Sequence, residues 1–151
     1  MKNASFEIEV TSHILANSMG IEGGKDKFPR DGANNLIFQA AWFYAAFNAA
    51  IKVARVRGIK PSDVHMDLTV KTPTDIYKRK YGDNKYRSHE AIMPGTKVNF
   101  NAIVADHVTE SGLREILDKM GRFVGLSPYG HNLGYGRFTL CDVKVASSED
   151  A

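Results

Sequence analysis

Apolar and polar residues alternate along three segments of this chain, and the alternation predicts three strands. The segments are Ser5–Ile14, Val64–Val70 and Lys97–Ala105. A fourth segment, Arg137–Val145, is largely apolar and predicts a closing strand. A period of two places the apolar side chains on one face of a strand. We therefore expect a sheet that packs against a core on one side and meets solvent on the other.

Two further segments space their apolar residues as helices do. The first starts from a cap at Asp31 or Asn34 and continues to about Arg57, with many alanines that allow close packing on a sheet. The second covers about Ser111–Phe123, with Thr109 or Ser111 as its cap. A polar, glycine-rich loop from residue 16 to 32 precedes the first helix. Long loops of this kind in compact domains usually carry function.

The order of these elements predicts an α+β protein of the ferredoxin-like (RRM-like) class, built as a split βαβ. A long basic insertion lies between the second and third strands, at residues 71–94, and a glycine-rich loop precedes the last strand. A chain of 151 residues suits one domain, residues 1–151, with a frayed tail at 147–151. Two helices on one sheet face leave the other face free, and RRM domains bind single strands there.

The amino-acid composition excludes only a few classes of protein. The apolar fraction of 43% and charged fraction of 25% are ordinary for a globular protein, and no apolar run has the length of a membrane span. The N-terminus has no signal-peptide pattern, so we expect a cytoplasmic protein. The single cysteine, Cys141, excludes an internal disulfide and a cysteine-based zinc site, and we expect it in the core. The aspartates are scattered and form no metal-ligand pattern, so no metal site is predicted. The sequence also predicts no cofactor and no catalytic residue.

The segment Lys71–Arg87 is strongly basic and carries aromatic rings. It has six basic and two acidic residues, a surplus of four that exceeds the net charge of +3 of the whole chain. Lysine and arginine neutralise phosphates, and tyrosine rings stack on unpaired bases. The alternative is a solvated loop whose tyrosines pack on the body of the domain. The candidate nucleic-acid contacts here are Lys71, Tyr77, Lys78, Arg79, Lys80, Tyr81, Lys85, Tyr86 and Arg87.

The segment Gly125–Gly136 holds four glycines. It lacks the Gly-Lys-Ser/Thr of a phosphate-binding P-loop, and it follows a helix, which excludes the dinucleotide fingerprint. One reading is a tight turn into the last strand. The other is a phosphate cradle of exposed amides at Gly134 and Gly136, assisted by His131 or Arg137.

The run Gly-Arg-Phe-Val-Gly-Leu-Ser-Pro-Tyr-Gly-His-Asn-Leu-Gly-Tyr-Gly-Arg-Phe-Thr-Leu, from Gly121, resembles the C-terminal glycine-rich signature of RAMP proteins. These are the RRM-like proteins of CRISPR antiviral complexes. The order of elements is similar to a minimal Cas7-like backbone subunit, with Arg30 in the loop after the first strand and the basic segment in the place of a protruding hairpin. The chain is shorter than a typical Cas7 subunit and its loop spacing is looser, so a stand-alone, phage-encoded relative fits as well.

The resemblance implies a protein that holds single-stranded RNA or DNA by its backbone, as a homo-oligomer or as a subunit of a larger ribonucleoprotein. Two alternatives stay open. One is a metal-independent endoribonuclease of the Cas6 or Cas5 type, in which His13 and His131 approach each other as general base and acid. The other is a phage anti-defence protein that mimics or blocks a host complex, or sequesters a nucleotide.

Overall fold

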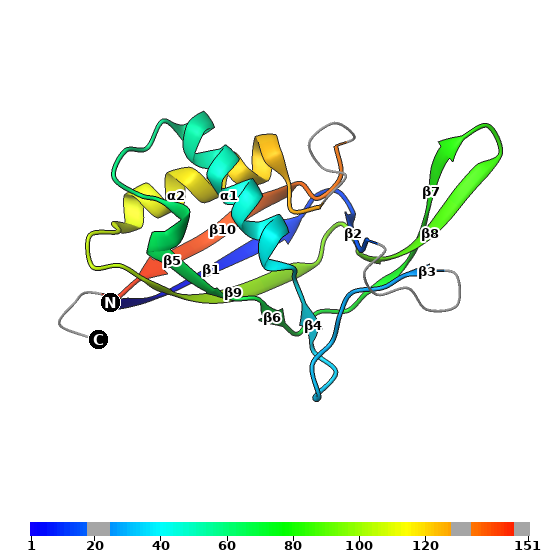
Figure 1. Cartoon of the computed structure of the whole chain (residues 1–151), viewed down its shortest axis with the longest axis horizontal. Helices are drawn as coiled ribbons and strands as arrows, with labels where there is room; N and C mark the ends of the chain where they lie inside the picture. Colours follow the sequence, from blue (N-terminus) through cyan, green and yellow to red (C-terminus); the bar gives the residue numbers. More distant parts are fainter. Residues whose placement is uncertain (18–24, 128–133, 147–151) are drawn as a thin grey trace.

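The computed structural model describes residues 1–17, 25–127 and 134–146, and its main element is a four-stranded sheet (Figure 1). The strand order is β10-β1-β9-β5, and every neighbouring pair is antiparallel. Helices α1 and α2 lie over one face of this sheet. The fold is therefore α+β, and its arrangement is compatible with a ferredoxin-like fold. The bounds are β1 (Lys2–Val10), β5 (Val64–Asp67), β9 (Lys97–Val104), β10 (Phe138–Val145), α1 (Ala40–Ala54) and α2 (Glu110–Lys119).

The core lies between this sheet and the helices, as the alternation predicts. Strand β9 buries every second residue from Val98 to Val104 and exposes those between. Phe6 of β1 stacks on Phe100 of β9 with ring centroids 5.0 Å apart. Helix α1 contributes Phe43 and Phe47 to the same core. None of the helices in the described ranges is long and apolar enough to cross a membrane.

A second, smaller sheet carries a hairpin that projects from the body at the end of the molecule opposite the N-terminus (Figure 1). Strands β7 (Asp75–Gly82) and β8 (Lys85–Ile92) are joined by the two-residue turn Asp83-Asn84. Asn84 has a φ of 55°, a conformation that asparagine tolerates better than most residues. At the hairpin base, β2 (Ile14–Leu15) pairs antiparallel and β3 (Lys25–Asp26) pairs parallel to β8.

Helix α1 begins later than the sequence predicts. Asp31 does not cap it, because its Oδ1 accepts the N–H groups of Ala33 and Asn35 and closes a local turn. Asn34 lies in the left-handed region at φ 63°, which a helix cap does not adopt. The apolar pair that follows forms β4 (Leu36–Ile37), which is antiparallel to β6 (Thr69–Val70).

Two predicted strands are each divided in the structure. The first ends at Val10, since the N–H groups of Thr11 and Ser12 both donate to the carbonyl of Arg137 at the start of β10. The chain then leaves the main sheet for β2. The second divides into β5 and β6 where Asp67 Oδ1 accepts the N–H of Thr69 at 3.0 Å. A 3-10 helix, η2 (Pro61–Asp63), precedes β5.

The second helix begins as predicted, with Thr109 Oγ1 accepting the N–H of Gly112 at 3.1 Å. It continues into a π-helical turn, η3 (Met120–Val124). Cys141 is exposed, so its placement in the core was wrong. A register shift between β1 and β10 at Glu7/Ile8 leaves both Cys141 and Asp142 outside the core.

Candidate functional site

The hairpin has two chemically different faces, set by the register of β7 against β8. Tyr77 lies opposite His89 and Arg79 opposite Arg87, and these four residues form what we call the inner face. Lys78 pairs with Ser88 and Lys80 with Tyr86, and these four form the outer face. Alternation along each strand separates the two sets.

The outer face and the tip are exposed and basic. Lys78, Lys80 and Lys85 are solvent-exposed, and Tyr86 keeps 57% of its surface accessible. Tyr81, at a register irregularity next to the turn, is 58% accessible. Rings this exposed are available for stacking, so the alternative in which the tyrosines pack on the domain is wrong for both.

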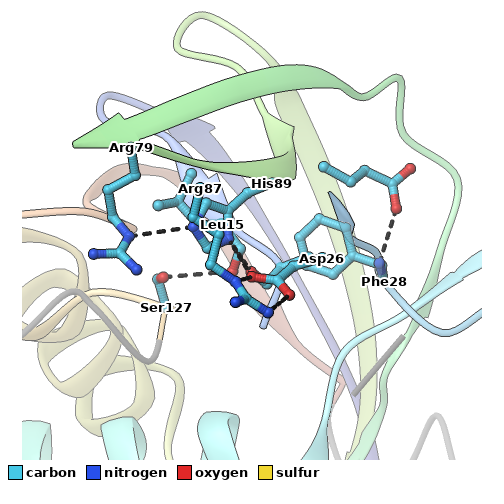
Figure 2. A network of polar contacts seen from close by, with 9 residues as sticks. Leu15, Asp26, Phe28, Arg79, Arg87, His89 and Ser127 are labelled. Atoms are coloured by element: carbon cyan, nitrogen blue, oxygen red, sulfur yellow. Dashed lines mark hydrogen bonds and ion pairs between the residues drawn. The ribbon is translucent and has the colours of Figure 1, made fainter. Parts of the chain in front are cut away.

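The inner face is anchored by a buried carboxylate. Asp26 of β3 is fully buried, and Arg87 grips it through two hydrogen bonds, Nε to Oδ2 at 2.6 Å and Nη2 to Oδ1 at 2.7 Å. His89 Nδ1 lies 3.0 Å from the same carboxylate. Figure 2 shows Arg87 and His89 converging on Asp26. Arg87, a predicted nucleic-acid contact, thus has a structural partner in the body of the protein, while 41% of its side chain stays exposed.

His89 connects this anchor to Arg79. Its ring is fully buried, with Nδ1 2.6 Å from the carbonyl of Ala16, and Arg79 Nε donates to its Nε2 at 3.2 Å (Figure 2). Burial lowers the pKa of His89 below its usual range, against the opposing influences of the Ala16 carbonyl and Asp26. The imidazole is therefore neutral at neutral pH.

A second buried carboxylate, Glu90, anchors the base of the hairpin. It forms an ion pair with Arg30, and it accepts the N–H of Phe28 at 2.8 Å and the hydroxyl of Thr74 at 2.7 Å. Burial would raise the pKa of Glu90, but these donors outweigh it and lower the pKa. Arg30, also a predicted contact, therefore serves the same structural purpose as Arg87.

In the described part of the glycine loop, backbone segments pack closely against one another. The N–H of Gly136 donates to the carbonyl of His13 at 2.8 Å, and a Cβ at Gly136 would lie 2.7 Å from the amide nitrogens of Leu126 and Ser127. A Cβ at Gly125 would lie 2.6 Å from the carbonyl of Tyr135. These glycines bring the chain against itself, so the Gly136 amide has a partner within the protein.

Gly134 differs from Gly136. It is exposed at φ 75°, with open space where a Cβ would lie, and its carbonyl accepts the Ser12 hydroxyl at 2.7 Å. An N–H on Nη1 of Arg137 donates to the carbonyl of Arg122 at 2.5 Å. Lys71 is exposed in the connection from β6 to β7. His131 lies outside the described residues.

Aromatic contacts join the hairpin to the glycine loop. The Tyr77 and Tyr135 hydroxyls are 3.3 Å apart, and the His13 ring centroid lies 4.2 Å from that of Tyr77. Burial, followed by the hydrogen bond with Tyr77, raises the pKa of Tyr135 to about 12. Burial lowers the pKa of His13. We call these three residues the Tyr77 cluster.

The free face of the main sheet is a poor match to an RRM platform. Within the described strands it carries no Phe, Tyr or Trp, whereas RRM domains stack bases on aromatic rings there. Four carboxylates outnumber two lysines on it. The residues of this face are Asn3, Ser5, Glu7, Glu9, His65, Asp67, Lys97, Asn99, Asn101, Ile103, Thr139, Asp142 and Lys144.

In the described ranges, no three His, Cys, Asp or Glu side chains are grouped so that they could hold a metal ion. The sequence pattern does not identify His89 and Glu90 as the buried groups that anchor the hairpin. One signal was present: both stand directly before the apolar pair Ala91-Ile92, where the basic segment returns to the core.

Comparison with known proteins gives a structural likeness only. No family model matches the chain, and no curated protein matches it. A chain in the cryo-EM structure of the Type III-B Cmr-beta complex bound to cognate target RNA is similar, with a TM-score of 0.61 and 16% sequence identity. The match covers 97% of this chain and 61% of that one, so this chain spans about three fifths of its length. At this identity the likeness establishes the fold.

Proposed function

We propose that this protein is a RAMP-like, Cas7-like module that binds single-stranded RNA along its backbone through the β7–β8 hairpin. The observation that carries the proposal is the outer face, where Lys78 and Lys80 stand beside exposed Tyr86 on a hairpin that leaves the body of the protein. Lysines at this spacing contact successive phosphates, and the ring stacks on an unpaired base. In this proposal the fold is a split βαβ and the hairpin is its insertion.

Contacts within the protein support a smaller set of proposed nucleic-acid contacts than the sequence alone. Arg87 and Arg30 belong to the anchors, and the Gly136 amide is already bonded. The proposed phosphate contacts are Lys71, Lys78, Arg79, Lys80 and Lys85, with Tyr81 and Tyr86 as stacking residues and exposed Gly134 beside the hairpin base. RNA is favoured over DNA because the similar chain belongs to a complex bound to target RNA.

Assembly is part of the same proposal. The similar chain is a component of a multi-subunit complex, and a hairpin that extends beyond its own domain can lie along a strand shared with a neighbour. We propose side-by-side copies on RNA or a place in a larger ribonucleoprotein. Mass photometry with and without a 40-nucleotide RNA tests this. A mass that stays at one protein per RNA at saturation contradicts side-by-side binding.

The test of binding is fluorescence anisotropy with labelled 20-nucleotide oligo(U), repeated from 50 to 300 mM salt. Single-strand binding loses about 0.7 log units of affinity per log unit of salt for each neutralised phosphate. Four cations on the hairpin predict a slope of about −3. Oligo(dT) of the same length measures the preference for RNA. No binding at 50 mM salt, or binding insensitive to salt, overturns the proposal.

A second function has one observation in its favour, the Tyr77 cluster. His13 is held neutral by burial next to the Tyr77 ring, and a neutral histidine can accept the proton of a 2′-hydroxyl in metal-independent RNA cleavage. Incubation with a hairpin RNA in EDTA tests it. A cut that is lost in His13→Ala would make cleavage the primary function. Intact RNA would exclude it.

A further inference from the structure

We infer that His89 is a positioning residue that aims Arg79 at bound nucleic acid, and that it does so only while its ring is neutral. The inference rests on the proposed function and extends it to the regulation of the site. Arg79 of β7 donates a hydrogen bond from Nε to the ring of His89, whereas Arg87 on the neighbouring strand binds the buried carboxylate of Asp26. Protonation of His89 breaks its hydrogen bond with Arg79.

The hydrogen-bond pattern fixes the state of the ring. A carbonyl only accepts hydrogen bonds, so His89 Nδ1, 2.6 Å from the carbonyl of Ala16, carries the hydrogen. Arg79 Nε only donates, so His89 Nε2, 3.2 Å away, has none. These two partners on opposite sides of the ring permit the neutral Nδ1–H tautomer alone.

The contact also orients the guanidinium. Because Nε is held at the histidine, the plane of the Arg79 guanidinium is fixed relative to the hairpin, and its terminal nitrogens lie on the side away from the ring. The same guanidinium lies 5.9 Å from the ring centroid of Tyr81. A guanidinium whose plane is fixed next to an exposed ring loses less side-chain entropy when it binds a phosphate.

A proton on Nε2 breaks this arrangement. It would place two N–H donors against each other and add a third positive charge to those of Arg79 on β7 and Arg87 on β8. Asp26 on β3 is the carboxylate that faces the ring, and it is already shared with Arg87. Tyr77 is the cross-strand neighbour on the same face. Arg79 therefore has to leave the ring when His89 is charged.

The direction of the pH effect follows from burial. The pKa of His89 is lowered, so the contribution of its neutral state is complete above the ordinary histidine pKa, about 6.5, and is lost as the pH falls below it. Acidification normally strengthens the binding of a polyanion because the protein becomes more positive. Displacement of Arg79 predicts the reverse.

The first experiment measures oligo(U) affinity at fixed ionic strength from pH 8 to pH 5. We expect the wild-type protein to bind about threefold to tenfold more weakly at pH 5, the value of one charge-assisted contact. His89→Gln offers Arg79 an amide oxygen and does not titrate, so it should bind like wild type at pH 8 and keep or gain affinity at pH 5. His89→Asn retains a donor for Ala16 but cannot reach Arg79, so it should be weak at both pH values. Equal pH profiles for wild type and His89→Gln overturn the inference.

The second experiment does not depend on RNA. In ¹⁵N NMR spectra of the free protein, the His89 ring nitrogens should report the Nδ1–H tautomer at pH 8, and the Arg79 Nε–H signal should shift as His89 titrates. An Arg79 signal that is unaffected by that titration overturns the inference even if RNA binds. A coupled shift without RNA binding at pH 8 supports the positioning and refutes the proposed function. The same spectra show whether each variant is folded.

Discussion

The hairpin and the free face of the main sheet are the two surfaces on which this fold could hold a single strand, and their chemistry is opposite. The outer face of the hairpin presents Lys78, Lys80 and Tyr86 without a carboxylate among its four residues. The sheet face presents Glu7 and Glu9 at its centre and no aromatic ring from Phe, Tyr or Trp among its described residues. The surface that matches the chemistry of nucleic acid is thus the one that the hairpin adds to the fold.

The comparison shows that fold class alone does not locate a binding surface. In an RRM domain the open sheet is the platform because aromatic rings project from it. Here the same geometric surface is amide-rich and acidic, and phosphates would be repelled by Glu7 and Glu9. The place where this fold binds a single strand therefore depends on the side chains that each surface carries.

Removal of two lysines from each surface gives the sharpest contrast. We expect Lys78→Ala/Lys80→Ala to bind oligo(U) about fifty- to hundredfold more weakly at 50 mM salt, with a salt slope shallower by about 1.4, because two phosphate contacts are lost. The matched control, Lys97→Ala/Lys144→Ala on the sheet face, should stay within about twofold of wild type. Anisotropy titrations measure both. A larger loss in the control would move the binding surface to the sheet.

Loss of the hairpin anchor should lower stability, whereas loss of a sheet-face charge should not. Asp26→Asn leaves Arg87 and His89 without the carboxylate they share, and we expect a fall of about 2 kcal/mol in the free energy of unfolding. The value is below that of fully buried pairs because Arg87 is 41% exposed. Asp142→Asn, whose lysine partner is exposed, is the control and should unfold as wild type does. Urea denaturation compares the two, and equal midpoints would refute the anchor.

Stacking on the outer face should be separable from charge. Tyr86→Ala should lower oligo(U) affinity about fivefold to tenfold while the salt slope stays unchanged, because a ring is lost and no ion. Tyr86→Phe keeps the ring and should bind as wild type does. On the sheet face, Ile103→Ala removes an apolar side chain of comparable exposure and should have no effect. If Tyr86→Ala changed the slope but not the affinity, stacking would be ruled out.

The smallest expected effect concerns the contact between the hairpin and the glycine loop. Burial and the Tyr77 hydroxyl together raise the pKa of Tyr135 to about 12. In Tyr77→Phe the pKa should fall, yet remain above the ordinary tyrosine value of about 10 because burial persists. Alkaline titration at 295 nm, with Tyr135→Phe to assign the signal, measures it. An unchanged pKa would mean that the two hydroxyls do not interact.

The sequence pattern correctly predicted elements that depend only on residues close together in the chain. Strand β9 and the Thr109 cap follow from alternation and from a threonine directly before a helical segment. The start of α1 was wrong because Asp31 bonds the N–H groups of its own turn, which a cap search cannot distinguish from helix capping. The alternation of residues did not predict the hairpin strands, because neither of their faces is apolar outside the base, and only the family resemblance placed a hairpin there.

The residue types of the candidate site could be predicted from the sequence, but the role of each arginine could not. The sequence shows that arginines and tyrosines gather in residues 71–87, but it does not show that Arg87 will find Asp26 or that Arg30 will find Glu90. Those pairs depend on β3 lying parallel to β8, a contact between distant segments. Burial of both carboxylates is the information that identifies Arg87 and Arg30 as anchors of the hairpin.

The anchor also has a consequence for the order of folding. Asp26 and Arg87 are 61 positions apart in the chain, whereas the strands of the hairpin meet across a two-residue turn. Hairpins form within about 1–10 μs, while a contact across a long loop has to overcome a larger closure entropy. We therefore expect the hairpin strands to pair early, and the direction in which the hairpin points to be fixed only when β3 arrives and Asp26 meets Arg87.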